Sequence, residues 1–231
     1  MRDRFHQQLE TLSIELTKMG ALCEEAISAG VMALLAGDRI MAQRAIACEK
    51  EIDAAERTIE SFCMKLLLQQ QPVARDLRAI SSALKMISDM ERIGDQAADI
   101  AELTAHIDAS FFPGRIHIDD MTRAAVKMVT DSVESFVKKD LNMARGVIQY
   151  DDVVDRSFLS VREELIALIR TDSTAAAQAL DLFMVAKYLE RIGDHAVNVA
   201  QWVIFSIIGD YCSDETSPCP PGVPNEERDL L

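Results

Sequence analysis

One pentapeptide, Glu-Arg-Ile-Gly-Asp, occurs twice in this chain, at 91–95 and at 190–194. Each copy lies inside a long segment whose apolar residues recur at helical spacing. Glycine costs about 1 kcal/mol relative to alanine inside a helix, and carboxylates on a packing face are unfavourable. Because this unfavourable feature is repeated, the sequence predicts an internal duplication. Each half is then expected to keep an acidic site at a helix-packing surface.

Matches outside the pentapeptide support the duplication. They include Met19, Asp38, Met41, Ala42, Ile46 and Asp53, which recur in the same order as Met121, Asp140, Met143, Ala144, Ile148 and Asp155. Gly37, Pro72 and the Pro113 turn break the helical pattern, and Asp38 and Asp140 are suited to cap the helices that follow. The sequence therefore predicts six long helices, at about 3–36, 38–70, 73–107, 119–138, 140–170 and 171–208.

The predicted fold is all-α, with two repeated antiparallel three-helix bundles related by a pseudo-two-fold axis, because short connections make neighbouring helices antiparallel. The first bundle is expected to span 1–110 and the second 115–210, and an acidic, proline-rich tail at 211–231 is expected to be disordered. A composition that is 49% hydrophobic but only 5% aromatic agrees with a helical protein.

Charge and cysteine usage restrict the function. A net charge of −14 argues against nucleic acid as a partner, since phosphates would be repelled. The five cysteines are dispersed and form no Cys-x-x-Cys pair, which indicates reduced thiols in a cytoplasmic protein. The N-terminus has no apolar signal core, and the apolar stretch 202–208 is far shorter than the roughly 18 residues of a membrane-spanning helix. We therefore expect no integral membrane segment.

Oxygen-bearing side chains four residues apart form stripes on four of the predicted helices, because such residues share one helix face. The third and sixth helices carry Glu91, Asp95 and Asp99, and Glu190, Asp194 and Asn198. The second and fifth carry Glu49 and Asp53, and Asp151 and Asp155. Four to five such groups from two facing helices make a hard-oxygen site. The sequence therefore predicts a metal site in each half, for iron or a divalent cation such as manganese, magnesium, calcium or zinc.

The two pentapeptide glutamates extend the apolar seams of their helices, together with Gly94 and Gly193. The arginine that follows each glutamate points about 100° away around the helix and is not expected to pair with it. The mid-helix glycines suggest close approach by a neighbouring backbone or a ligand. Two alternatives remain: arginine–carboxylate pairing inside the bundle, and solvent-exposed faces for the pairs on the second and fifth helices.

The repeated pentapeptide with its trailing Ala-x-Asp or Ala-x-Asn, the Arg-Asp-Leu-Arg at 75–78 and the two-fold repeat together resemble the PhoU family of bacterial phosphate-transport accessory proteins. The resemblance covers about 3–208. It implies a cytoplasmic, homodimeric regulator that couples the ATPase subunit of a phosphate ABC transporter to a sensor histidine kinase and represses the phosphate regulon. It also implies metal clusters on the ten stripe residues named above, and contact with membranes only through partners.

Three functions compete. The leading hypothesis is a non-enzymatic, metal-binding regulator. A carboxylate-bridged di-metal enzyme of the ferritin-like kind expects Glu-x-x-His, whereas Gly94 and Gly193 lie three residues after the two glutamates. A metal-free helical scaffold is the third reading. Separately, Arg75, Asp76 and Arg78 open the third helix without a counterpart in the second half; anion or partner binding and helix capping both explain them.

Overall fold

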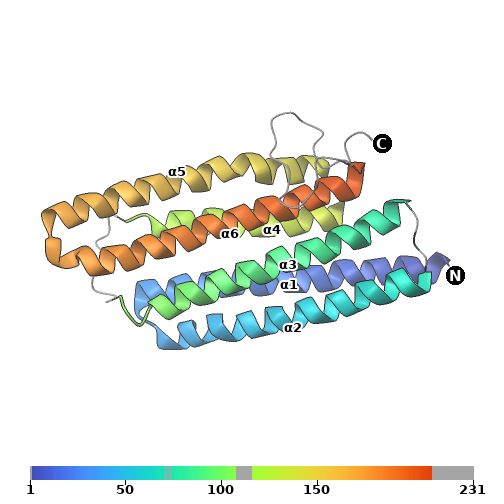
Figure 1. The fold of residues 1–231 in the computed structure, drawn as a ribbon, viewed down its shortest axis with the longest axis horizontal. Helices are drawn as coiled ribbons and strands as arrows, with labels where there is room; N and C mark the ends of the chain where they lie inside the picture. Colours follow the sequence, from blue (N-terminus) through green and yellow to red (C-terminus); the bar gives the residue numbers. More distant parts are fainter. Residues whose placement is uncertain (1, 71, 73, 108–115, 210–231) are drawn as a thin grey trace, which may run out of the picture.

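Helices make up nearly all of the chain that the structure, a computed structural model, describes: residues 2–70, 72, 74–107 and 116–209 (Figure 1). The long helices are α1 (Arg2–Ala36), α2 (Arg39–Gln70), α3 (Ala74–Leu103), α4 (Ile118–Lys138), α5 (Leu141–Thr171) and α6 (Ala176–Ile208), and a short 3-10 helix, η2 (Ser173–Ala175), precedes α6. The expected turn around Pro113 and the expected disordered tail at 211–231 lie outside the described residues. The prediction of an all-α protein with six long helices is confirmed.

The helices form two antiparallel three-helix bundles that share one core. Helices α1, α2 and α3 contact one another, as do α4, α5 and α6, and the bundles join along α3–α6 and α1–α4. In Figure 1 the second bundle lies above the first, with α6 over α3. A single hydrophobic cluster includes residues of all six helices, among them Leu16, Ile52, Met90, Val129 and Val154. The repeats are thus packed against each other through continuous apolar contact.

Equivalent caps start the second helix of each repeat. The Asp140 side chain accepts hydrogen bonds from the amides of Asn142 and Met143, and Asp38 Oδ1 accepts one of 2.8 Å from the Ile40 amide. Both satisfy helix N–H groups that have no partner within the helix. Gly37, at φ 64°, follows α1 in the left-handed conformation that favours glycine. Short-range chemistry therefore sets these boundaries, as the sequence predicts.

The third helix is shorter than predicted. It ends at Leu103 instead of about residue 107. After that point the backbone bonds tighten to three-residue spacing, as in the 3.0 Å bond from the His106 amide to the Leu103 carbonyl. The Thr104 hydroxyl also donates to the Ala101 carbonyl at 2.6 Å, competing with helical bonding. Ile107 nevertheless stays buried, which explains why the apolar pattern continues beyond the helix.

The sixth helix begins later than the predicted start at 171. Asp172 has an extended backbone and interrupts the path from α5 to α6. Its Oδ1 accepts from the amide and the hydroxyl of Thr174, at 2.9 and 2.6 Å. These bonds stabilise η2, and α6 follows at Ala176. The start signal in the sequence is real, but it opens a 3-10 turn first.

Helix α1 meets the length and hydropathy expected of a membrane-spanning segment between Arg4 and Ala36. More than half of its most apolar window, 56%, is buried inside the bundle. A buried core helix passes the same test, so this weak signal is explained by packing. Of the cysteines in the described ranges, Cys23, Cys48 and Cys63 are buried and unbridged, which agrees with the expected reduced thiols.

Candidate functional site

The first acidic site lies where α2 and α3 pack against each other. Glu49 and Asp53 face it from α2, and Glu91 and Asp95 face it from α3. The side chains are half-buried: 30% of Asp53, 21% of Glu91 and 32% of Asp95 are exposed. They therefore line the rim of the helix contact, between its apolar core and solvent. Water and small cations can reach such carboxylates.

Mutual repulsion among these carboxylates raises the pKa of two of them, Glu49 and Glu91. Burial raises the pKa of Glu49, and the charges of Asp53 and Asp95 raise it further. Burial likewise raises the pKa of Glu91; Asp95 adds to that rise, Arg92 opposes it, and Glu56 and Asp53 contribute less. Because groups on one helix affect those on the other, the two stripes do face each other. Glu56, which the sequence did not single out, belongs to the same cluster.

Basic side chains partly neutralise the first site. Arg92 Nη1 lies 3.1 Å from Asp95 Oδ2, and Arg92 Nε lies 3.4 Å from Glu91 Oε2. Arg57 Nη2 pairs with Asp53 Oδ2 at 3.0 Å. The prediction that the arginine would not pair with its neighbouring glutamate is wrong for this copy, because a long, exposed side chain can fold back along its helix. Since both arginines are exposed and pair along their own helices, these pairs differ from the arginine–carboxylate pairing inside the bundle that the sequence left open.

The second acidic site lies at the equivalent contact between α5 and α6. Burial raises the pKa of Asp151 to about 6, with further increases from Asp155, Asp194 and Glu190. Burial raises the pKa of Asp194 too, followed by the charge of Glu190. Lys187 Nζ pairs with Glu190 Oε2 at 2.6 Å. Four carboxylates from two helices thus lie close enough to influence one another, with one ammonium group at the edge.

The repeated glycines face side chains of the opposing helix, and at Gly94 the approach leaves no room for a Cβ atom. A Cβ atom at Gly94 would lie 2.9 Å from Ile52 Cδ1, which is too close. A Cβ atom at Gly193 would lie 3.4 Å from Asp151 Oδ1 and 3.5 Å from Val154 Cγ1. The expected close approach is present, although a side chain makes it and not a neighbouring backbone. In the second repeat these are ordinary contact distances, so the site does not require a glycine at this position.

The last residue of each stripe contacts the other repeat. Asn198 Nδ2 donates to Asp89 Oδ1 at 3.0 Å, and His195 Nδ1 lies 2.9 Å from the same oxygen. Burial raises the pKa of Asp99, as do nearby acidic groups, while a hydrogen bond with Tyr188 lowers it. Asp99 and Asn198 occupy equivalent repeat positions, as do Asp89 and Tyr188. No local sequence pattern indicates these contacts, because they depend on how α3 docks on α6.

The structure therefore brings together four predicted ligands per repeat and places the fifth at the repeat interface. Within the described ranges, no three His, Cys, Asp or Glu side chains converge closely enough to hold a metal ion as they lie. The donor chemistry nevertheless fits a hard cation, since it consists of carboxylate oxygens that repel one another. Cation binding would require side-chain rotation and release of Arg92 or Lys187. The metal-ligand assignment stays a prediction.

Comparison with known proteins covers both repeats. The family model described as PhoU domain matches residues 16–104 and 118–203. The phosphate-specific transport system accessory protein PhoU homolog of Pseudomonas aeruginosa is 33% identical over 208 residues, spanning 89% of this chain and 86% of that protein. The homolog from Clostridium acetobutylicum is 34% identical over 215 residues, spanning 90% and 96%.

Solved structures agree with these matches. The crystal structure of PhoU from Pseudomonas aeruginosa superposes with a TM-score of 0.82 at 33% identity, covering 89% of this chain and 100% of that one. A crystal structure described as the phosphate transport system regulatory protein PhoU from Streptococcus pneumoniae has a TM-score of 0.82 at 24% identity, covering 90% of this chain and 98% of that one. The latter likeness concerns the fold alone.

Proposed function

Since the chain belongs to the PhoU family, we propose that it negatively regulates phosphate uptake and the phosphate-starvation regulon. The observation that carries the proposal is the match of both repeats to the family domain, with relatives of about one-third identity over nearly their whole length. Those relatives are named accessory proteins of phosphate-specific transport. A regulatory role in phosphate uptake is the coarsest function consistent with all of these names.

The proposed partners are the ATPase subunit of a phosphate ABC transporter and a sensor histidine kinase. The protein would act in the cytoplasm as a homodimer, reaching the membrane only through these partners. It would act without catalysis: the two glutamates are followed by Gly94 and Gly193 where a di-metal enzyme has histidines. An oxidase or hydrolase activity that rises with metal content would contradict the non-catalytic part of the proposal.

Gene deletion tests the regulatory role. A strain without the gene should transcribe its phosphate-starvation genes in phosphate-rich medium, at a level close to that of the starved parent. Returning the gene on a plasmid should restore repression. Unchanged transcription in the deletion strain would count against the regulatory role.

We further propose that each repeat binds a hard cation, either iron or a divalent ion. The candidate ligands are Glu49, Asp53, Glu91, Asp95 and Asp99 in the first repeat, and Asp151, Asp155, Glu190, Asp194 and Asn198 in the second. One observation supports this: carboxylates on facing helices raise one another's pKa. A bound cation would replace repulsion between the paired helices with attraction.

Metal analysis tests this second proposal. The protein is purified from cells grown with iron and manganese, and metal per chain is measured for the wild type and for Glu91→Ala with Glu190→Ala. Glu60→Ala with Glu163→Ala is the matched control, because both glutamates are exposed on the same helix pairs. We expect metal in the wild type and the control, and less in the site variant. A metal-free wild type whose stability is unchanged by a chelator would contradict cation binding and leave the regulatory role intact.

A further inference from the structure

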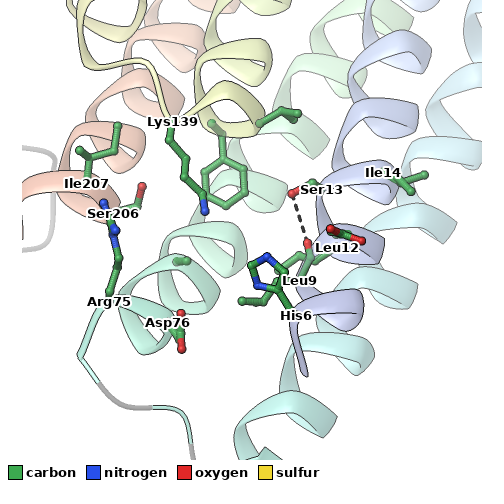
Figure 2. A pocket seen from close by; sticks show the side chains of 14 residues that line it. His6, Leu9, Leu12, Ser13, Ile14, Arg75, Asp76, Lys139, Ser206 and Ile207 are labelled. Atoms are coloured by element: carbon green, nitrogen blue, oxygen red, sulfur yellow. Dashed lines mark hydrogen bonds between the residues drawn. The ribbon is translucent and has the colours of Figure 1, made fainter. Parts of the chain in front are cut away.

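A cavity at one end of the molecule belongs to neither acidic site. It has a volume of about 520 Å³ and lies where α1, the start of α3 and the ends of α4 and α6 meet (Figure 2). Leu9, Leu12 and Phe136 give it apolar walls. Two exposed apolar side chains, Ile14 and Val137, line it as well. Its size and apolar walls are typical of a site that receives a ligand or a peptide segment.

Two cationic groups and a histidine face this cavity from three helix segments. They are Arg75 in the first turn of α3, Lys139 just after α4, and His6 on α1. In Figure 2, Arg75 and Lys139 lie on the side of the cavity that Ser206 and Ile207 line. Among the described residues, neither the Arg75 nor the Lys139 side chain has a hydrogen bond or ion pair. Glu10 and Asp76 also line the cavity and balance part of its charge.

A third cation lies where the chain leaves α6. A Cβ atom at Gly209, the last described residue, would lie 3.2 Å from Arg78 Cζ, so the backbone rests on that guanidinium. Arg78 Nε is buried and has no hydrogen-bond partner in the described part of the chain. A buried N–H without an acceptor is costly. An acceptor brought close to Gly209 would satisfy this N–H group.

These cations are particular to one repeat. The residues equivalent to Arg75 and Arg78 in the second repeat are Thr174 and Ala177. Lys139 has a φ of 54°, and its equivalent in the first repeat is Gly37, the residue type that this conformation favours. Each of these basic residues therefore lacks a basic equivalent in the other repeat, and the duplication alone does not explain them.

We propose that residues 210–219 of the same chain occupy this cavity. The segment reads Asp-Tyr-Cys-Ser-Asp-Glu-Thr-Ser-Pro-Cys, with three acidic residues, one aromatic residue and no basic one. Asp210 supplies the acceptor for Arg78, Asp214 and Glu215 pair with Arg75 and Lys139, and Tyr211 contacts the apolar wall. Opposite charge and an apolar side chain match both kinds of lining.

The covalent connection makes this docking favourable even if each contact is weak. The segment follows Gly209 directly, and two residues just before it, Ser206 and Ile207, already line the cavity. Ten extended residues span up to about 33 Å. A short tether gives an effective concentration in the millimolar range, so millimolar affinity suffices for occupancy. An occupied cavity is closed to any other acidic segment.

Two native cysteines in the segment report its docking. The full chain is treated with a maleimide, and labelling of Cys212 and Cys219 is followed by mass spectrometry; Cys23, Cys48 and Cys63 are buried and serve as folding controls. Arg75→Gln with Lys139→Asn should speed labelling of the segment about threefold to tenfold, since two exposed ion pairs are lost. Asparagine is chosen because it tolerates positive φ. Arg39→Gln with Arg156→Gln, both exposed and outside the cavity lining, should change nothing.

A second variant keeps the test independent of bundle stability. Asp214→Lys with Glu215→Lys alters only the segment and should speed labelling as much as the cavity variant does. In NMR spectra of the full chain, the amide signals of 210–219 should differ from those of a synthetic peptide of that sequence and move toward them in either variant. Equal labelling rates in all proteins, or segment signals identical to those of the free peptide, would overturn the proposal.

Discussion

Asp151 is the carboxylate whose negative charge should most destabilise the folded protein. It is half-buried against Gly193, and Asp155, Asp194 and Glu190 surround it. Replacing it by asparagine keeps the shape of the side chain and removes the charge. We predict that Asp151→Asn is more stable than the wild type at about pH 7.5 in metal-free buffer.

The magnitude follows from the pKa of Asp151, which rises from 3.8 to about 6 on folding. At about 1.4 kcal/mol per pKa unit this gives an upper limit of about 3 kcal/mol, and solvent screening at the half-buried site reduces it to about 1–2 kcal/mol. Because the folded state binds the proton more tightly, Asp151 destabilises the wild type least below about pH 4, and this destabilising effect grows as the pH rises to about 6. The gain from Asp151→Asn should therefore be absent below about pH 4 and complete above about pH 6.

Urea unfolding followed by circular dichroism measures this difference, with a chelator present and at several values between about pH 4 and pH 7.5. Asp152→Asn is the matched control, since Asp152 is the exposed neighbour and should show little change. An Asp151→Asn protein less stable than the wild type near neutral pH would refute this destabilising role, because it would mean that the Asp151 charge makes a net favourable contact. A gain that does not vary with pH would refute it too.

Gly94→Ala should destabilise the protein by about 1–2 kcal/mol, because the new methyl group collides with Ile52 and outweighs the gain in helix propensity. The methyl group of Gly193→Ala would make only ordinary contacts, so this variant should stabilise the protein by up to about 1 kcal/mol. Urea unfolding measures both variants, and a Gly94→Ala protein more stable than Gly193→Ala would contradict the prediction. Elsewhere, a hydrogen bond to Glu164 raises the pKa of His117. This hydrogen bond favours the charged imidazole, so the stability that it contributes is lost as the pH rises. Glu164→Gln should therefore lower the pKa of His117 in an NMR titration. An unchanged pKa would show that Glu164 is not the cause.

Helices were predictable because their signals are local. Asp140 caps α5 through amides two and three residues away, and any sequence pattern that includes this spacing detects it. The end of α3 was missed because Ile107 keeps its apolar position after the helix has changed to a tighter turn. Apolar spacing indicates burial, and burial continues beyond the last helical bond.

The acidic sites were predictable in outline for the same reason. Residues four apart share a face, and the duplication indicated which faces meet, so Glu91 and Asp95 lie opposite the acidic pair of α2. The partners of these groups were not predictable. Arg92 folds back onto its own helix, which depends on a flexible side chain. Asn198 reaches Asp89 only because the two repeats dock along α3 and α6.

The two sites also differ in how they are neutralised. Arg57 and Arg92 pair with carboxylates of the first site, whereas Lys187 pairs with one carboxylate of the second. Burial and the neighbouring carboxylates all raise the pKa of Asp151. The second site should therefore gain more than the first from an added cation, which the metal analysis can detect when Glu91→Ala and Glu190→Ala are measured separately.

We expect the duplicated acidic sites to be required for phosphate regulation. The most direct test is a phosphate-starvation promoter fused to a reporter, measured in phosphate-rich medium in the deletion strain. The wild-type chain and the control Glu60→Gln with Glu163→Gln should repress the reporter. Glu91→Gln with Glu190→Gln should leave it active at equal protein abundance. Full repression by that site variant would contradict the claim.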